Sequence, residues 1–363
     1  MSQILTFLGK GGVGSTTIAI AAAKRLATQG KRVLFATDDS TPAIGLLLNP
    51  LTPDPQEIAP NLQVVQLKSS ILLERNWEEV KKLEAQYLRT PIIKDVYGQE
   101  LVVLPGMDKA LVLNAIREYD ASGNYDVIIY DGGSDSTTLR MIGMPESLSW
   151  YSRRFGKLIT DSDIAKTIGP FIQPLIGTIF NVGFTGDNFT QPTSKVTNIL
   201  EQGKAALADP KRFAAYLVTT DDPASVATAR YLWGSAQLEG LTVAGAILNQ
   251  TTMTETVSAD FSPLTVSAVP TCPAGDWQPL MDALPDFTQT PQVPKPLEFD
   301  VAARLVRLFL PGFDKKQVKL TQSGGEITIE AGDRRRNILL PPGLTGRTVT
   351  GAKFQQGYLI ISL

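Results

Sequence analysis

Near its amino terminus the chain reads GKGGVGSTT over residues 9–17. An apolar run, Ile4–Leu8, precedes this stretch, and apolar residues at helical spacing, Thr17–Gln29, follow it. A glycine-rich turn between a buried strand and a helix lets several backbone N–H groups point at one anion, and the helix amino terminus adds partial positive charge. The stretch therefore predicts a phosphate-binding loop that holds a nucleotide through Gly11, Gly12, Val13, Gly14, Ser15, Thr16 and Thr17, with the Thr16 hydroxyl placed to bind Mg²⁺.

Two positions separate this loop from the ordinary phosphate-binding loop. Ser15 stands where a lysine usually contacts the terminal phosphates, and loss of a charge-assisted hydrogen bond of about 1.5–3 kcal/mol weakens binding roughly 10- to 150-fold unless another cation compensates. Lys10 remains at the earlier position of the deviant pattern KGG-x-G-K-[ST], whose first lysine reaches the phosphates of the other subunit in a dimer. The loop thus resembles the deviant type, with its second lysine missing.

Two aspartates follow predicted buried strands. Asp131 ends the apolar segment 125–130, the expected position for a carboxylate that holds a Mg²⁺-bound water. Asp38 ends the run Val33–Thr37 and is placed to orient an attacking water, which phosphoryl transfer requires. Asp39 is the alternative for this role, and we favour Asp38.

Asn249 follows a third buried run, Val243–Leu248. Its amide could read the edge of an adenine, or it could be an ordinary turn residue at the end of a strand. Spacing does not separate these two interpretations.

Apolar runs alternate with amphipathic segments along most of the chain, which predicts a doubly wound, mostly parallel α/β sheet of the P-loop NTPase class. The predicted strands are Ile4–Leu8, Arg32–Ala36, Leu62–Leu67, Leu101–Leu104, Asp126–Tyr130, Ala214–Thr219, Val243–Leu248 and Leu264–Val269, and the predicted helices are Thr17–Gln29, Trp77–Arg89, Lys109–Tyr119 and Pro223–Leu238.

The pattern also predicts the domain boundaries. Residues 1–284 form the nucleotide domain, with a helical insertion at about 144–205 that glycines and prolines interrupt. A Pro-rich linker occupies residues 285–297. Residues 298–363 alternate apolar and polar side chains between glycine-rich turns, which predicts a small antiparallel β-sandwich.

Composition excludes several classes of function. The 363 residues hold 34 Lys and Arg against 36 Asp and Glu, and this balance argues against a protein that coats nucleic acid. There is no His, and the single Cys272 excludes an intramolecular disulfide and a zinc site made of cysteines from one chain. A strand-like start and no apolar run of ~20 residues lead us to expect a cytoplasmic protein without stable membrane insertion.

These motifs together resemble the ArsA-type ATPases, which comprise the arsenite-pump ATPases and the targeting ATPases of tail-anchored membrane proteins. The resemblance covers about residues 1–290 and is carried by GKGGVGSTT, ATDDSTP (36–42), LPGMDKALVL (104–113), DGGSDSTTLRMIGMPESLSWY (131–151) and AGAILNQ (244–250). The remaining tail resembles a small heat-shock (α-crystallin) domain through LPGF (310–313), Arg334–Arg336 and GYLIISL (357–363). The combination is similar to the plastid and cyanobacterial branch of the targeting ATPases.

The resemblance implies a homodimeric ATPase that hydrolyses ATP to ADP and phosphate with Mg²⁺. Asp38 would orient the water in the first switch, Asp131 would be the Walker B carboxylate, and Lys10 would act on the other subunit. Asn249 would contact adenine, and Gly132 and Gly133 would belong to the second switch. Closure of the dimer would build a groove from the helical insertion, in which a hydrophobic client segment binds. The family's paired zinc-binding cysteines have no counterpart, so we expect no zinc.

Departures from the family pattern keep other interpretations open. Ser15, Asp39–Ser40 and Gly132–Ser134 replace family residues and bear on the catalytic rate more than on nucleotide binding. Ser15 favours a nucleotide-gated scaffold without hydrolysis as the alternative. A metalloid-transport ATPase is a further alternative, against which the missing cysteines count. Ile164–Phe184 could line the client groove or pack in the core, and the β domain could hold clients or brace the dimer. Arg334–Arg336 is interpreted as a solvated strand face and not as a nucleic-acid site.

Overall fold

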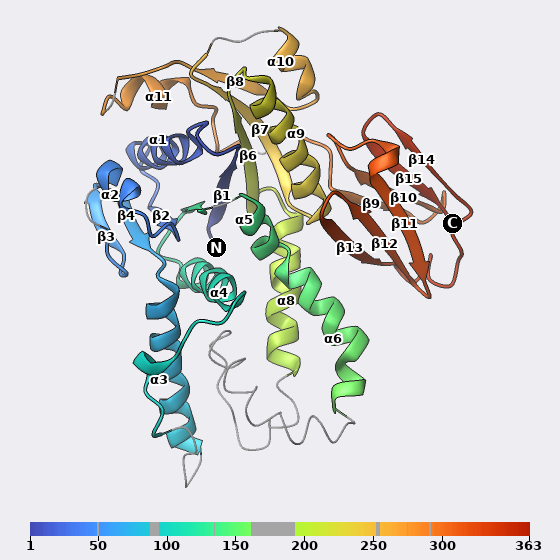
Figure 1. Cartoon of the computed structure of the whole chain (residues 1–363), viewed down its shortest axis with the longest axis horizontal. Helices are drawn as coiled ribbons and strands as arrows, with labels where there is room; N and C mark the ends of the chain where they lie inside the picture. The colour runs from blue at the N-terminus through green and yellow to red at the C-terminus, as the bar shows by residue number, and fades with distance from the viewer. Residues whose placement is uncertain are drawn as a thin grey trace.

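The nucleotide domain is built on one eight-stranded sheet with the order β3-β4-β2-β5-β1-β6-β7-β8. The computed structural model describes residues 1–48, 51–87, 94–133, 135–160, 193–251, 255–273, 275–289 and 292–363. All neighbouring strands are parallel except β3, which pairs antiparallel with β4 at one edge (Figure 1). The strands are β1 (Gln3–Leu8), β2 (Val33–Thr37), β3 (Gln56–Ala59), β4 (Leu62–Gln66), β5 (Val127–Asp131), β6 (Phe213–Thr219), β7 (Thr242–Asn249) and β8 (Val266–Val269).

Helices cover both faces of this sheet, as burial of its apolar strands requires. On one face α1 contributes Ile18, Ile20 and Leu26 to a buried cluster, and on the other face α4, α5 and α9 contribute Ile116, Leu139 and Trp233. The helices are α1 (Ser15–Thr28), α2 (Pro42–Leu48), α3 (Ser69–Tyr87), α4 (Met107–Ser122), α5 (Asp135–Ile142), α6 (Met144–Thr160), α8 (Thr193–Ala208), α9 (Pro223–Leu238), α10 (Glu255–Asp260) and α11 (Gln278–Ala283). The predicted doubly wound α/β fold is therefore confirmed.

One predicted strand is wrong. Leu101–Leu104 forms no strand; it follows the 3₁₀ helix η1 (Gly98–Glu100) and leads into α4. Val102 and Leu104 are 79% and 51% exposed. A short apolar run does not reveal whether a place in the sheet exists for it, and this segment has none. The other predicted strands lie within two residues of the observed ones.

The helical insertion leaves the sheet through α6 and returns through α8, and these two helices pack together, with α8 below the sheet and α6 below the β domain (Figure 1). The apolar segment Ile164–Phe184, expected as groove or core, lies outside the described residues. None of the described helices is both long enough and apolar enough to cross a membrane.

Part of the predicted linker is attached to the nucleotide domain. Phe287 is 1% exposed and meets Tyr216 edge-on, with 4.9 Å between ring centroids. Its carbonyl accepts a hydrogen bond of 3.1 Å from the Gln3 side chain. The chain therefore remains fixed to the sheet at Phe287 before it reaches the β domain.

The carboxy-terminal domain consists of two antiparallel sheets, ordered β14-β15-β10-β9 and β11-β12-β13. Alternate side chains along β12 and β15 point into a shared core with Val306, Leu308 and Leu344. The strands are β9 (Leu297–Asp300), β10 (Leu305–Phe309), β11 (Val318–Ser323), β12 (Glu326–Ala331), β13 (Arg334–Leu339), β14 (Gly351–Gln355) and β15 (Tyr358–Ser362), and the 3₁₀ helix η3 (Lys315–Gln317) precedes β11. The predicted antiparallel β domain is confirmed.

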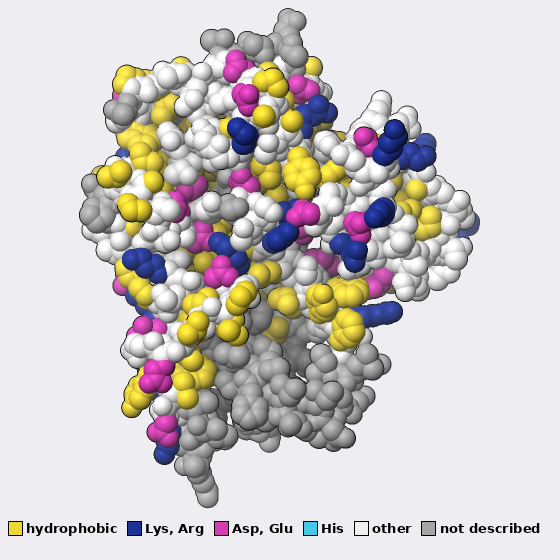
Figure 2. Space-filling view, in the orientation of Figure 1, with side chains coloured by type: hydrophobic (Ala, Val, Ile, Leu, Met, Phe, Trp, Pro, Cys, Tyr) yellow, Lys and Arg dark blue, Asp and Glu magenta, His cyan; other side chains and the backbone are white. Residues whose placement is uncertain are grey.

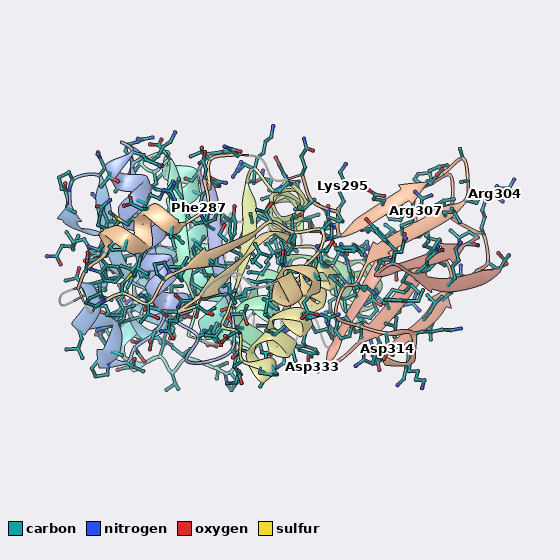
Figure 3. All side chains as sticks on the ribbon, turned by 90° about the horizontal axis from the view of Figure 1, so that it is seen from above. Phe287, Lys295, Arg304, Arg307, Asp314 and Asp333 are labelled. Atoms are coloured by element: carbon teal, nitrogen blue, oxygen red, sulfur yellow. The ribbon has the colours of Figure 1, made fainter. Side chains whose placement is uncertain are left out.

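The β domain packs against α9 and lies at one end of the molecule (Figure 3). Contact with α9 is close at Gly234, where an added Cβ would stand 2.2 Å from the Pro311 carbonyl oxygen. The expectation of a solvated face is wrong for Arg334, which is 4% exposed at this boundary, whereas Arg335 is exposed. The reason is the strand period, because Arg334 and Arg335 point to opposite faces of β13.

Candidate nucleotide site

The loop between β1 and α1 lies tightly against the sheet on one side and is open on the other. An added Cβ on Gly9 would stand 2.3 Å from the Val218 carbonyl oxygen and 2.7 Å from a Val13 methyl carbon. Gly12 and Gly14 have φ angles of 90° and 88°, which only glycine adopts readily. Gly11 and Gly12 face open space. The loop therefore has the shape needed to bring backbone N–H groups close to an anion.

Asn249 braces this loop from the end of β7. Its Nδ2 donates a hydrogen bond of 2.8 Å to the Val13 carbonyl, and the residue is 3% exposed. An added Cβ on Gly14 would stand 2.5 Å from the same Nδ2. The predicted contact between Asn249 and adenine stays a prediction, to which the structure adds a role in holding the loop.

The predicted magnesium residues lie together. Thr16 Oγ1 donates to Asp131 Oδ1 over 3.3 Å, and Asp131 is 4% exposed. Burial raises the pKa of Asp131 to about 7; the Thr16 bond opposes this shift and the charges of Asp39 and Asp38 add to it. A hydroxyl beside a buried carboxylate among other carboxylates fits Mg²⁺, which takes one or two protein ligands and completes its shell with water and phosphate. The described residues hold no cluster of three or more His, Cys, Asp or Glu that could bind another metal.

Asp38 contacts both the segment after β5 and helix α4. Its Oδ1 accepts a hydrogen bond of 3.0 Å from the Gly133 N–H, and its Oδ2 forms an ion pair with Lys109 Nζ on α4. Asp39 instead accepts bonds of 2.8 and 3.0 Å from the N–H and hydroxyl of Thr41, just before α2. Of the two candidates, Asp38 is therefore the one in contact with Gly133, which is predicted to belong to the second switch.

Sequence reasoning missed two residues of this site, Lys109 and Asp135. Lys109 lies in a quoted motif, but no spacing rule pairs it with a residue 71 positions away. Asp135 begins α5, and the nearby backbone N–H of Gly9 lowers its pKa, against the larger effect of burial. Lys10 and Ser15 flank the glycines; Lys10 is exposed and Ser15 is the first residue of α1. The action of Lys10 on a second subunit stays a prediction.

The pKa of Asp135 makes the stability of the nucleotide-free protein depend on pH. Burial raises this pKa to about 7 from 3.8, so the folded state keeps a proton that the unfolded state loses between these values. Stability therefore falls as pH rises from about 4 to 7. We expect Asp135→Asn to raise the free energy of unfolding by about 1–2 kcal/mol at pH 8, after a discount for partial exposure, and by less than half as much at pH 5. Urea denaturation at both pH values measures this, and an equal effect at pH 5 and pH 8 would contradict it.

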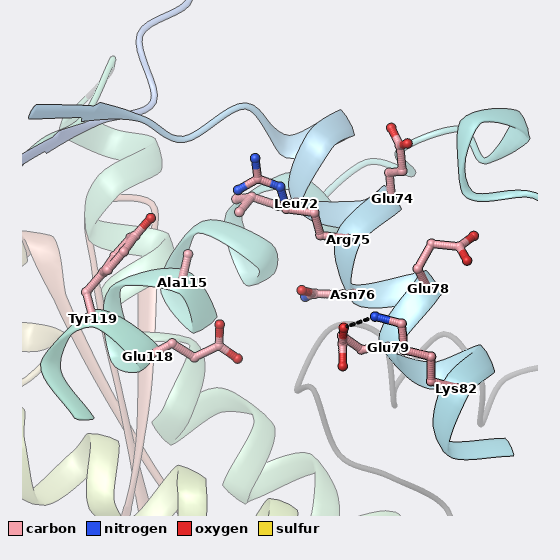
Figure 4. A pocket seen from close by; sticks show the side chains of 10 residues that line it. All are labelled: Leu72, Glu74, Arg75, Asn76, Glu78, Glu79, Lys82, Ala115, Glu118 and Tyr119. Carbon is pink, nitrogen blue, oxygen red and sulfur yellow. Dashed lines mark hydrogen bonds and ion pairs between the residues drawn. The ribbon is translucent and has the colours of Figure 1, made fainter. Parts of the chain in front are cut away.

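A separate cleft of about 450 Å³ lies between α3 and α4 (Figure 4). Charged side chains such as Arg75, Glu78 and Lys82 line it, and Lys82 pairs with Glu79 over 2.7 Å. Burial raises the pKa of Tyr119 in its wall to about 12. None of its lining residues belongs to the phosphate-binding loop, so we do not assign the nucleotide to it.

Each of the two domains matches a known protein family. The model of the anion-transporting ATPases matches residues 2–265, and the model of the HSP20-like domain found in ArsA matches residues 303–363. An Aquifex aeolicus protein named "Putative arsenical pump-driving ATPase 1" is 23% identical over an alignment of 400 positions that covers 99% of each chain. A similarly named Chlorobaculum tepidum protein is 34% identical over 149 residues, which are 41% of this chain and 37% of that protein's length. An Entamoeba dispar "ATPase ASNA1 homolog" is 23% identical over 208 residues, 55% of this chain and 61% of the relative.

Proposed function

Because the chain belongs to the ArsA family of anion-transporting ATPases, we propose that it binds and hydrolyses ATP with Mg²⁺ as a homodimeric targeting factor or chaperone. Bound ATP favours a closed dimer that shelters a hydrophobic segment of the tail-anchored kind. Hydrolysis reopens the dimer. Nucleotide achieves this through its different affinity for the two states.

The observation that carries the proposal is that three neighbouring strands, β2, β5 and β1, bring the predicted site residues together at their carboxyl ends. Asp38 follows β2, Asp131 is the last residue of β5, and the phosphate-binding loop follows β1. Doubly wound sheets bind their ligands at the carboxyl ends of their strands. Thr16 and, through water, Asp131 would hold Mg²⁺, which neutralises phosphate charge when bound.

Lys109 bears on the missing lysine at position 15. It places a cation on Asp38, the residue proposed to orient the attacking water, with 18% of the Lys109 side chain and 5% of the Asp38 side chain exposed. The ion pair fixes the direction of the carboxylate before nucleotide arrives, while Asp38 keeps the negative charge that attracts a proton of the attacking water. Phosphoryl transfer depends mainly on such positioning, which supports hydrolysis without a lysine in the loop.

Two apolar features support the client-binding part of the proposal. A cavity of about 480 Å³ lies among α4, α6 and α8, with Leu113, Leu148 and Leu200 in its wall. Tyr151 and Phe155 of α6 are 57% and 39% exposed, and hydrophobic side chains gather where α6 runs below the β domain (Figure 2). Exposed apolar surface of this kind is typical of a binding surface.

Thr16→Val should weaken Mg²⁺-dependent ATP binding about tenfold or more, because it removes one oxygen ligand at nearly constant volume. Titration calorimetry with and without Mg²⁺ measures the loss. Thr28→Val at the other end of α1, where the hydroxyl donates to the Arg25 carbonyl, is the control and should leave the affinity unchanged. Equal ATP affinities for wild type and Thr16→Val would refute the magnesium assignment.

Capture of a client tests the proposal as a whole. A peptide with an apolar helix of about 20 residues should bind the wild-type protein with Mg²⁺-ATP and dissociate with Mg²⁺-ADP. Nucleotide-independent capture would contradict the closed-dimer model. Stimulation of ATP turnover by arsenite would instead favour a metalloid-transport ATPase, for which Cys272 is the one cysteine of the chain.

Ser15 favours one second candidate, a nucleotide-gated scaffold that changes shape without hydrolysis. It would bind Mg²⁺-ATP and capture the peptide, but phosphate release would stay at background. The Asp38 variant described in the Discussion separates the two candidates.

A further inference from the structure

The β domain contacts the second switch through a buried arginine. Arg334, the first residue of β13, donates from Nη1 to Glu239 Oε1 over 2.8 Å and from Nη2 to the Ser136 carbonyl over 3.0 Å. Ser136 is the second residue of α5, the helix that follows Gly132 and Gly133. Arg334 thus places the β domain directly on the backbone of the second switch.

The residue before Arg334 holds the other end of the same helix. Asp333 pairs with Arg140, in the last turn of α5, over 2.7 Å and accepts a hydrogen bond of 3.0 Å from the Tyr231 hydroxyl on α9. Asp333 lies on the side of the β domain that faces the nucleotide domain (Figure 3). We call Asp333 and Arg334, with Ser136 and Arg140, the α5 contact.

The Glu239 carboxylate lies where the absence of a side chain at Gly143 leaves room for it. An added Cβ on Gly143, at the junction of α5 and α6, would stand 2.0 Å from Glu239 Oε2. Burial raises the pKa of Glu239, and the Arg334 bond opposes this shift. The carboxylate therefore lies between the α5–α6 junction and Arg334 and orients the guanidinium toward Ser136.

The Arg334 guanidinium does not use all of its hydrogen-bond donors. Its Nε is buried without a hydrogen-bond partner among the described residues. An unpaired buried donor is unfavourable, so stability is a poor explanation for an arginine at this position. Its bonds to Glu239 and to the Ser136 carbonyl instead suit a residue that fixes the position of α5.

The other side of the second switch faces the nucleotide site. The Gly133 N–H donates to Asp38 over 3.0 Å, and the nearby Gly9 N–H lowers the pKa of Asp135, against the larger effect of burial. Asp135 and Ser136 are consecutive, so the loop and Arg334 act on adjacent residues of one short segment. We therefore expect a change that nucleotide imposes on this segment to reach the α5 contact.

We propose that Arg334 is a positioning residue that couples the β domain to the nucleotide state of the second switch. The inference rests on the proposed binding of Mg²⁺-ATP. Arg334 holds the start of α5 so that Gly133 and Asp135 keep their places beside Asp38 and Gly9. Because such coupling acts equally in both directions, Mg²⁺-ATP bound at the loop changes how readily the hydrogen bonds between β12 and β13 open.

The test compares Arg334→Met, Arg334→Lys and Arg335→Met in the full chain. In wild type, Mg²⁺-ATP should slow amide hydrogen exchange in β12 and β13, and Arg334→Met should abolish this response and lower ATP turnover about tenfold. Arg334→Lys should restore part of both. Arg335 pairs with Glu330 on the exposed face of β13, so Arg335→Met should behave as wild type. Glu239→Gln keeps the shape of its side chain but loses the charge that orients Arg334, so its response should lie between those of wild type and Arg334→Met. It takes the place of Arg334→Met if that variant does not fold.

The outcomes separate the two proposals. A wild-type protein that does not bind Mg²⁺-ATP refutes the proposed function and this inference with it. A wild-type protein that binds ATP, beside Arg334→Met and Glu239→Gln proteins with unchanged turnover and unchanged exchange response, overturns the coupling and leaves the proposed function standing.

Discussion

Asp38→Asn is expected to lower kcat for ATP hydrolysis by about 10²–10³-fold, within the range typical of a lost acid–base or water-positioning group. The amide can still accept the Gly133 N–H, but it has no charge with which to hold Lys109 or to attract a proton of the attacking water. Affinity for ATP should change little, because Asp38 is not part of the phosphate-binding loop. Steady-state phosphate release and equilibrium ATP binding measure the two quantities separately.

Asp39→Asn is the matched control for this variant. Asp39 has the same chemistry one residue away, but its carboxylate bonds to Thr41. We expect it to retain at least half of the wild-type kcat. Equal losses in both variants would contradict the assignment of Asp38. Background turnover in wild type, with ATP bound, would favour the nucleotide-gated scaffold.

Gly9→Ala is expected to reduce the free energy of unfolding by about 2–4 kcal/mol, among the larger effects of single substitutions. The new methyl group would meet the Val218 carbonyl oxygen, which belongs to β6 in the middle of the sheet and has no room to move. The loop should shift away from the sheet, and ATP binding should weaken with it. Urea denaturation of the nucleotide-free protein measures the stability.

Gly11→Ala is the control in the same loop, because an added Cβ there meets no atom within 4 Å. Its free energy of unfolding should stay within about 0.5 kcal/mol of wild type. If Gly9→Ala proves as stable as Gly11→Ala, the contact between the loop and β6 is softer than the structure indicates.

The elements that sequence reasoning found are those whose signal is local. GKGGVGSTT places the loop because strand, glycines and helix are consecutive, and Asp131 ends β5 because the apolar run before it is unbroken. Helix α9 begins at Pro223, as predicted, with Asp222 accepting the Ser225 N–H over 2.9 Å as its cap. In these cases one segment of sequence contains the whole cause of the structure.

The elements that it missed depend on contacts between distant segments. Lys109 matters because α4 brings it to Asp38, and Arg334 is buried because the β domain packs against α5 and α9. Nothing within the run Arg334–Arg336 distinguishes its buried members from its exposed one except the strand period. Leu101–Leu104 fails for the same reason, since an apolar run does not state whether a neighbouring strand is available to it.

The space at Gly143 has a consequence for how this chain can diverge. A side chain at position 143 would displace the Glu239 carboxylate, and a displaced Glu239 would leave the Arg334 guanidinium with an unbalanced charge in a buried position. Positions 143, 239 and 334 are therefore expected to covary. A homologue that carries a larger residue at 143 should have lost the acid and the base together, and in such a chain the β domain would meet the nucleotide domain through a different set of residues.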